Sequence, residues 1–326
     1  MANIESVKLP DNTSYNIHDA TAQPATLVTP LTIEGVTQTT VEGALGGLNT
    51  RAFSNPNLLM NPWFTVNQRG VVSLSTNADV GKYLVDRWYA DAKTTLGTLT
   101  VTSNGIQSVN ATLPAYNRIE QPFEDERLNL LTGKTLTMSV LLSDGTIKCG
   151  AINSFDPTTD MTFFEDNSIM LAYKISTKKN FRIGTKVDCT VKAVKLEIGS
   201  TSTLHLDTAP DYTTELLKCQ RYFRRLSTPL KYSFLGVCRA DSSQYAFYYV
   251  RNAVPMRALP TVSYSGSYSL VQSESTTYSV SNIYLRNYSA LDNITLVIVT
   301  SGMTAGTVVD LMSATDNSYI DLSAEV

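Results

Sequence analysis

The stretch Val194–Phe223, which reads VKLEIGSTSTLHLDTAPDYTTELLKCQRYF, decides how this chain divides. Its first five residues, Val194–Ile198, alternate apolar and charged side chains, which predicts a half-buried strand that stops at Gly199. Asp211 follows a proline and is a candidate helix N-cap. A new apolar segment begins at Tyr222. The stretch therefore predicts the end of one β-domain, a short helix, and the start of a second domain.

Four motifs occur in order along the chain. They are NLLMNP with NQRG (57–70), VDRW (85–88), KLEIG followed by ELLKCQRYF (195–223), and VPMRALPTV (254–262). Together they resemble a recurring signature of phage and prophage tail-fibre and receptor-binding proteins. The resemblance spans residues 57–262. It implies a jelly-roll domain similar to carbohydrate-binding modules, and a chain that assembles as a homotrimer in the virion tail.

Length and composition narrow the class of protein. A chain of 326 residues suffices for two ordinary domains. The net charge of −3 argues against a broad phosphate-binding surface, so we expect no nucleic-acid partner. The first ten residues contain no apolar core of signal-peptide length. The longest strongly apolar run, Ile294–Val299, is far too short to span a membrane, so no membrane insertion is expected.

The four cysteines are scattered along the chain without a C-x-x-C pair. This spacing predicts small buried hydrophobic side chains rather than a zinc site or a disulfide framework. We expect a protein that is made and assembled in a reducing cytosol. The resemblance to tail proteins implies that this is the host cytoplasm and that the protein ends in the virion tail. The cysteines are Cys149, Cys189, Cys219 and Cys238.

Residues 1–22 read as a small hairpin, with a turn at Pro10–Asn12 between two short apolar segments. A hairpin of this size is too short to fold alone. It also resembles the V-x-L-P-D-G-x-x-Y-x-I-x-D start of many tail proteins from phages of Gram-positive hosts. The resemblance implies an attachment end that binds other virion tail or baseplate proteins.

Residues 23–56 predict a linker with a short helix. Thr39 and Glu42 fit a capping box, and Val41, Leu45, Leu48 and Ala52 follow at spacings of four, three and four. An isolated helix of this length is marginal in water, so its apolar stripe must pack on something. It either docks on the following domain or forms a parallel bundle with other copies of the chain. The second alternative agrees with the homotrimer that the resemblance implies.

The rest of the chain predicts an all-β fold. Residues 57–207 form a jelly-roll, carbohydrate-binding-like domain, and residues 208–326 form a C-terminal β-sandwich, with a short helix joining the two antiparallel sandwiches. The predicted strands include Leu58–Asn67 and Tyr278–Arg286. One further helical turn is expected within Pro122–Leu131.

Catalytic patterns are scarce. His18 and His205 are the two histidines, and no P-loop or Rossmann glycine pattern occurs, so we expect no enzyme. Glu124–Glu126 reads as a solvated helix start. A looser acidic group is interpreted as a polar loop, with a structural calcium site or glycoside hydrolysis as alternatives. Its members are Asp156, Asp160, Glu165 and Asp166.

Aromatic residues are the better indication of a binding surface. In a strand around residues 278–288, every second side chain lies on the same face. Those on one face include Tyr278, Asn282, Tyr284, Arg286 and Tyr288. Tyrosine rings stack on sugars, while Arg and Asn side chains bond hydroxyl groups. The face therefore predicts either a glycan site or a subunit contact, and tyrosine-rich core packing is the alternative. A similar alternation, in Tyr245, Phe247 and Tyr249, is predicted to be core.

The sequence thus favours a non-enzymatic, homotrimeric phage tail fibre or receptor-binding protein. It would attach to the virion by its N-terminus and bind a host cell-surface glycan through its β-sandwich domains. The first alternative is an architectural virion protein, at the tail tip or as a head decoration, without a ligand. The second is a polysaccharide depolymerase.

Overall fold

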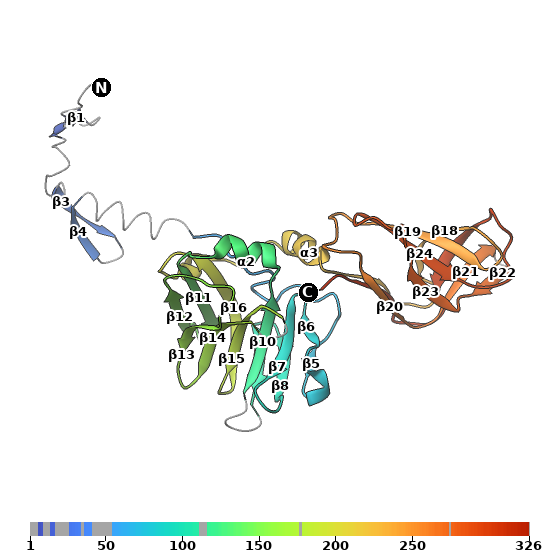
Figure 1. The fold of residues 1–326 in the computed structure, drawn as a ribbon, viewed down its shortest axis with the longest axis horizontal. Coiled ribbons are helices and arrows are strands. Elements are labelled where there is room, and N and C mark those ends of the chain that lie inside the picture. The colour runs from blue at the N-terminus through green and yellow to red at the C-terminus, as the bar shows by residue number, and fades with distance from the viewer. Residues whose placement is uncertain are drawn as a thin grey trace. The chain divides into compact units, whose positions relative to one another are not determined.

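A computed structural model of the protein describes residues 54–110, 116–175, 178–273 and 275–325, and four short strands nearer the N-terminus (Figure 1). Residues 1–55 and 56–326 form two separate compact units. In the first unit, β1 (Ser6–Lys8) pairs antiparallel with β2 (Ser14–Asn16), as the hairpin prediction expects. A second antiparallel pair, β3 (Thr26–Ile33) and β4 (Val36–Thr40), was not predicted.

The predicted oligomerisation stripe lies outside the described residues. Its members Val41, Leu45, Leu48 and Ala52 therefore remain a prediction from the sequence alone.

The second unit begins with two six-stranded antiparallel sheets. One has the order β13-β14-β15-β10-β7-β6, and the other has the order β12-β11-β16-β9-β8-β5. Their strands are β5 (Ser73–Leu74), β6 (Tyr83–Val85), β7 (Trp88–Ala92), β8 (Thr98–Thr102), β9 (Gly105–Val109), β10 (Asn117–Pro122), β11 (Leu136–Leu142), β12 (Ile147–Ile152), β13 (Met161–Glu165), β14 (Ile169–Lys174), β15 (Asn180–Thr185) and β16 (Cys189–Ile198).

One hydrophobic core lies between these two sheets. Trp88 and Leu171 from the first sheet and Leu136 and Leu196 from the second are fully buried in it. The strand predicted from Val194–Ile198 lies within β16, but the prediction that it is half-buried was wrong, because the side chains of Lys195 and Glu197 are also fully buried. The all-β fold of antiparallel sheets is confirmed.

The segment 58–67 is not a strand, so that prediction was wrong. Asn61 and Phe64 have φ angles of 49° and 58°, in the left-handed region that no strand residue adopts. The side chain of Asn61 holds this turn by donating to the carbonyls of Val66 (2.8 Å) and Asp86 (2.9 Å). The apolar residues of the segment are therefore anchors of a buried loop, which mimic a strand pattern.

Of the three predicted helical segments, the two that lie within the described residues are present. They are α2 (Asp125–Leu131) and α3 (Tyr212–Gln220), and two short 3-10 turns, η1 (Asn77–Asp79) and η2 (Leu204–Leu206), accompany them. Asp211 caps α3 by accepting from the backbone N–H of Thr214 at 2.8 Å. The buried carboxylate of Glu215 accepts from the backbone N–H of Asn61 at 2.8 Å, so α3 is fixed to the first sandwich.

The C-terminal part of this unit holds two further antiparallel sheets. A three-stranded sheet has the order β17-β26-β20, and a seven-stranded sheet has the order β22-β21-β25-β18-β19-β24-β23. The strands are β17 (Phe223–Thr228), β18 (Phe234–Ala240), β19 (Tyr245–Arg251), β20 (Thr261–Ser265), β21 (Tyr268–Ser273), β22 (Thr276–Ser279), β23 (Asn282–Leu285), β24 (Asn293–Val299), β25 (Val308–Ser313) and β26 (Ser318–Ser323). A second hydrophobic core, with Leu311 and Ile320, joins them.

The predicted strand Tyr278–Arg286 is in fact two strands, β22 and β23, at opposite edges of the seven-stranded sheet. Only two residues separate them. The backbone N–H of Val280 donates to Tyr268 of β21 (3.0 Å), and that of Ser281 donates to Val299 of β24 (2.8 Å). The sheet therefore curls until its two edges approach each other. Residue alternation continues through this point and gives no sign that the chain changes its partner strand.

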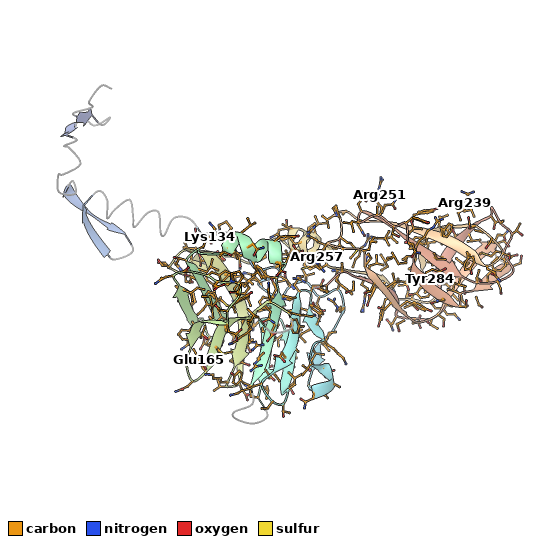
Figure 2. The ribbon with its side chains drawn as sticks, viewed as in Figure 1. Lys134, Glu165, Arg239, Arg251, Arg257 and Tyr284 are labelled. Atoms are coloured by element: carbon orange, nitrogen blue, oxygen red, sulfur yellow. The ribbon has the colours of Figure 1, made fainter. Side chains whose placement is uncertain are left out.

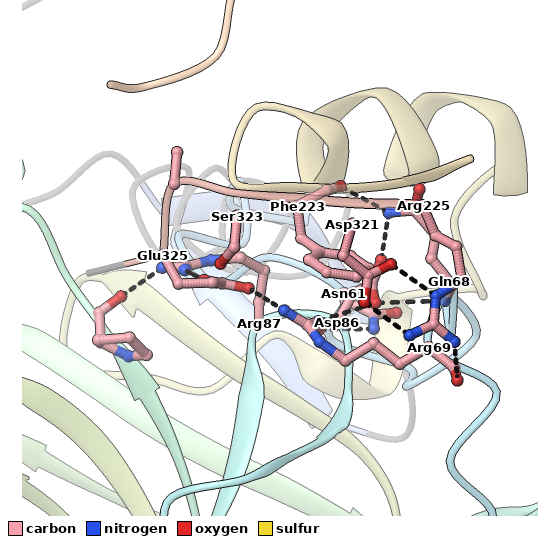
Figure 3. Close-up of polar contacts among 12 residues, drawn as sticks. Asn61, Gln68, Arg69, Asp86, Arg87, Phe223, Arg225, Asp321, Ser323 and Glu325 are labelled. Atoms are coloured by element: carbon pink, nitrogen blue, oxygen red, sulfur yellow. Dashed lines mark hydrogen bonds and ion pairs between the residues drawn. The ribbon is translucent and has the colours of Figure 1, made fainter. Parts of the chain in front are cut away.

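A buried polar junction joins the first sandwich to the C-terminal sheets (Figure 3). It draws on the N-Q-R-G, V-D-R-W and C-Q-R-Y-F motifs and on the end of the chain. We define the junction by its residues, which are Gln68, Arg69, Asp86, Arg87, Tyr222, Phe223, Arg225, Asp321 and Glu325.

Arg87 is the most constrained residue of the junction. It is 1% exposed and has a φ of 71°. Its guanidinium forms an ion pair with Glu325, donates to the carbonyl of Pro122 at 2.6 Å, and lies 3.7 Å from the centre of the Tyr222 ring. A buried arginine is tolerated only because all these partners are in place.

Two more arginines complete the junction. Arg69 lies between Asp86 (3.3 Å) and Glu325 (3.2 Å), and its guanidinium is 3.5 Å from the centre of the Phe223 ring. Arg225 makes a two-pronged contact with Asp321, with both distances 2.7 Å, and donates to the backbone carbonyl of Arg69. The two sandwiches are thus held together by charge-assisted hydrogen bonds rather than by apolar contact alone.

We predict that Arg87→Met lowers the free energy of unfolding by about 3 kcal/mol, because it leaves the buried Glu325 without its closest partner. Differential scanning calorimetry should show a lower midpoint and a broader or split transition. Arg239→Met, at an exposed position on β18, is the matched control and should leave the midpoint unchanged (Figure 2). An Arg87 variant as stable as the control would contradict this role of the junction.

We also predict a pH-dependent contribution from Asp86. Burial raises the pKa of Asp86 to about 6, although the hydrogen bonds from Gln68 and the charge of Arg69 act in the opposite direction. The folded protein therefore holds this proton more tightly than the unfolded chain does. The stability that Asp86 contributes is fully present below about pH 4 and is lost as the pH rises through about 6, by at most about 3 kcal/mol.

Urea unfolding at pH 4.5 and pH 7.5 measures this effect. Between these two pH values, the Asp86→Asn variant should lose less stability than the wild type. An identical pH dependence in both proteins would show that Asp86 does not titrate in this range.

Candidate functional site

The outward face of the sheet β13-β14-β15-β10-β7-β6 is hollowed into a cavity of about 640 Å³. This is within the range of about 300–1,000 Å³ that is usual for ligand sites. We call it the sheet-face cavity. Its lining residues are Val80, Gly81, Tyr89, Asp91, Tyr116, Arg118, Glu120, Asp160, Met170, Lys174, Lys178 and Arg182.

Strand alternation explains why these side chains meet. On β7, Trp88 and Ala90 enter the core, so Tyr89 points to the other face. The register then places Tyr89 opposite Glu120 of β10, and Glu120 opposite Arg182 of β15. Three neighbouring strands thus contribute one polar row across the floor of the cavity.

An ion-pair network fixes that row. The Tyr89 hydroxyl donates to Glu120 at 2.5 Å, and the Arg182 guanidinium pairs with the same carboxylate. Asp91 is shared between Arg118 (3.2 Å) and Arg182 (3.4 Å). Glu120 is 2% exposed, and burial raises its pKa even though Arg182 and Tyr89 act the other way. The polar groups of the floor are therefore held in place before any ligand arrives.

An apolar platform lies beside the network. The ring of Tyr116 lies close to Gly184 of β15, because a Cβ atom at Gly184 would be only 3.0 Å from it. Met170 and Ala172 complete this buried cluster. The absence of a side chain at Gly184 lets the aromatic ring approach the sheet, which gives the cavity one apolar wall.

Two lysines lie at the cavity. Lys174 pairs with Asp160 at 3.1 Å. The ammonium of Lys178 lies 5.2 Å from the ring centre of Tyr89 and 6.0 Å from that of Tyr83. The cavity thus combines tyrosine faces with cationic donors.

The acidic residues that suggested calcium serve other purposes. Asp156 accepts from the backbone N–H of Thr158, and Asp166 accepts from Ser168 and Ile169, as side chains do when they cap turns. Glu165 pairs with Lys186. Within the described residues, no three His, Cys, Asp or Glu side chains are grouped to hold a metal ion.

The cysteine prediction holds in part. Cys219 and Cys238 are buried, and Cys189 is half-buried against the core. Cys149 is exposed, so the prediction was wrong there. It lies on β12, an edge strand of its sheet, where the sequence pattern does not show which face is covered.

The predicted aromatic surface is only partly assembled. Tyr284, Arg286 and Tyr288 line a second cavity of about 250 Å³, together with Asp241, Tyr245, Phe247, Asn287 and Val297. We call it the aromatic cavity, and Tyr284 marks it in Figure 2. The Arg286 guanidinium lies 3.9 Å from the centre of the Phe247 ring.

Tyr278 and Asn282 do not line this cavity. The Tyr278 hydroxyl donates to Gln272 (3.0 Å), and Asn282 accepts from the Tyr264 hydroxyl (3.3 Å). The chain changes its partner strand between Val280 and Ser281, which separates Tyr278 from Tyr284, whereas Asn282 shares β23 with Tyr284 but contacts Tyr264. The core prediction for β19 was also wrong in part, because Tyr245 and Tyr249 are 38% and 50% exposed.

The sheet-face cavity was missed from the sequence. Its floor depends on β10 and β15, and neither strand was predicted. The alternation Arg118-Ile119-Glu120 was a usable signal, because it places two charges on the face opposite a core residue.

Comparison with known proteins found no matching family model, no matching curated protein and no matching solved structure. Among the described residues, neither helix is long and apolar enough to cross a membrane.

Proposed function

We propose that this protein is a non-enzymatic phage tail-fibre or receptor-binding protein that binds a host cell-surface glycan. The observation that carries the proposal is the sheet-face cavity, where tyrosine rings and a fixed row of charged groups meet on the open face of a β-sandwich. An aromatic ring offers an apolar face to a sugar ring, and the polar groups beside it can bond its hydroxyls.

The network favours binding over hydrolysis. A glycosidase needs one carboxylic acid and one carboxylate that are free to act on the bond. Asp91 and Glu120 are instead held by Arg118, Arg182 and Tyr89. Such fixed groups suit recognition, because little side-chain freedom is lost when the ligand binds.

The position in the virion is proposed from the motifs. The N-terminal hairpin would attach the chain to tail or baseplate proteins, and the stripe Val41, Leu45, Leu48 and Ala52 would join three copies. Three copies of a weak site bind a cell surface with much greater avidity than one. Light scattering of the intact protein tests this assembly, and a monomer at micromolar concentration would count against it.

We predict that Val80→Trp abolishes or weakens glycan binding by at least about tenfold, because the larger side chain fills the mouth of the sheet-face cavity. Val80 is 43% exposed, so the fold should tolerate the change. A glycan array finds the ligand, and titration calorimetry measures it. Val109→Trp, on β9 of the opposite sheet and 39% exposed, is the matched control and should bind normally.

Three outcomes separate the alternatives. Equal loss in both variants would show that the cavity is not the site. Binding to neither the array nor host cells would favour the architectural protein without a ligand. Release of oligosaccharides from host polysaccharide by the wild type would favour the depolymerase.

The aromatic cavity is proposed as a second contact with the same glycan. We predict that Tyr284→Ala combined with Tyr288→Ala weakens binding between about threefold and tenfold through lost stacking. The two side chains are 42% and 90% exposed, so stability should not change. Tyr249→Ala, on the same sheet and outside the cavity, is the control. Unchanged affinity in the double variant would leave the sheet-face cavity as the glycan site.

A further inference from the structure

We propose that the glycan bound in the sheet-face cavity is anionic and carries a carboxylate or phosphate group that Lys178 and Arg118 recognise. This inference rests on the proposed glycan-binding function and names the chemical class of its ligand.

The lining carries more positive than negative charge. Four cationic side chains, Arg118, Lys174, Lys178 and Arg182, face three carboxylates, Asp91, Glu120 and Asp160, which leaves an excess of one positive charge. A cavity with low-dielectric walls concentrates such an excess toward its ligand.

The pairing leaves Lys178 as the surplus cation. Asp91 is bound by two arginines, Glu120 by Arg182, and Asp160 by Lys174. Among the described residues, the contacts of the Lys178 ammonium are with the rings of Tyr89 and Tyr83 rather than with a carboxylate. An ammonium held over tyrosine faces remains free to pair with an anion on a bound sugar.

Arg118 supplies a second indication. Its Nε atom is buried and has no hydrogen-bond partner within the described residues. An unsatisfied buried donor is costly, so the protein alone leaves part of the hydrogen-bonding capacity of the Arg118 guanidinium unused. Its guanidinium is 5.3 Å from the ring centre of Tyr116, and Lys93 lies 5.4 Å from the same ring. The apolar wall of the cavity is thus flanked by positive charge.

The excess of one positive charge among the lining side chains favours an anionic sugar over a neutral one.

The test begins with an array that contains neutral, carboxylated and phosphorylated glycans, among them oligogalacturonates, their carboxyl-reduced forms and sugar phosphates. The bound ligand and its neutral counterpart are then titrated against the wild type and Lys178→Met. Methionine keeps a long, unbranched side chain, one atom shorter than lysine, but removes the charge. Lys134→Met, at an exposed site outside the cavity (Figure 2), is the charge-matched control.

We expect the wild type to bind the anionic ligand at least about tenfold more tightly than its neutral counterpart. Lys178→Met should lose most of that preference while Lys134→Met retains it. Raising NaCl from about 50 to about 500 mM should weaken binding of the anionic ligand alone. Whether the protein binds the carboxylated or the phosphorylated glycans on the array would show which anionic group it recognises.

Equal affinity for the anionic and neutral forms, or a preference that survives in Lys178→Met, would overturn this inference and leave the proposed function intact. Absence of binding to every glycan and to host cells would instead overturn the proposed function itself.

Discussion

The buried ion pair between Arg87 and Glu325 is the constraint on which the arrangement of this protein depends. The two residues are 238 positions apart in the sequence, and both side chains are almost fully excluded from solvent. A buried guanidinium without its carboxylate would be strongly destabilising. The end of the chain must therefore return to the first sandwich, next to α3, whenever that sandwich is folded. Arg69 pairs with the same Glu325, and Arg225 donates to the backbone carbonyl of Arg69, so the junction is a network rather than one contact.

This junction also changes how the sequence motifs are understood. Gln68 and Arg69 of N-Q-R-G and Asp86 and Arg87 of V-D-R-W meet at the junction with Tyr222 and Phe223 of C-Q-R-Y-F, and not at either cavity. Asn61 and Trp88 hold the loop beneath them. These motifs thus describe how a β-sandwich is joined through a helix to the next domain. They carry information on architecture, and the ligand must be inferred from the residues that line the cavities.

The sequence correctly predicted the features that depend only on local residue patterns. The strand within Val194–Ile198, the cap of α3 at Asp211 and the helical turn before Leu131 all follow from period and capping chemistry. The predictions from sequence were wrong where the structure of a segment depends on which strand it pairs with. Leu58–Asn67 has a strand-like pattern but is held as a loop by the Asn61 amide, and Tyr278–Arg286 crosses between two sheet edges. The polar floor of the sheet-face cavity needed the pairing of β7, β10 and β15, which no single segment of the sequence contains.

The two cavities differ in how much order they hold before binding. In the sheet-face cavity the carboxylates and guanidinium groups already hold one another, so a ligand meets fixed groups and loses little free energy to side-chain ordering. In the aromatic cavity Tyr288 is 90% exposed and must give up its freedom to stack on a sugar. The first cavity is therefore suited to selecting a ligand by its charge, and the second to adding contact area. Because specificity depends on differences in affinity, we propose that the first sandwich, rather than the second, would recognise the glycan.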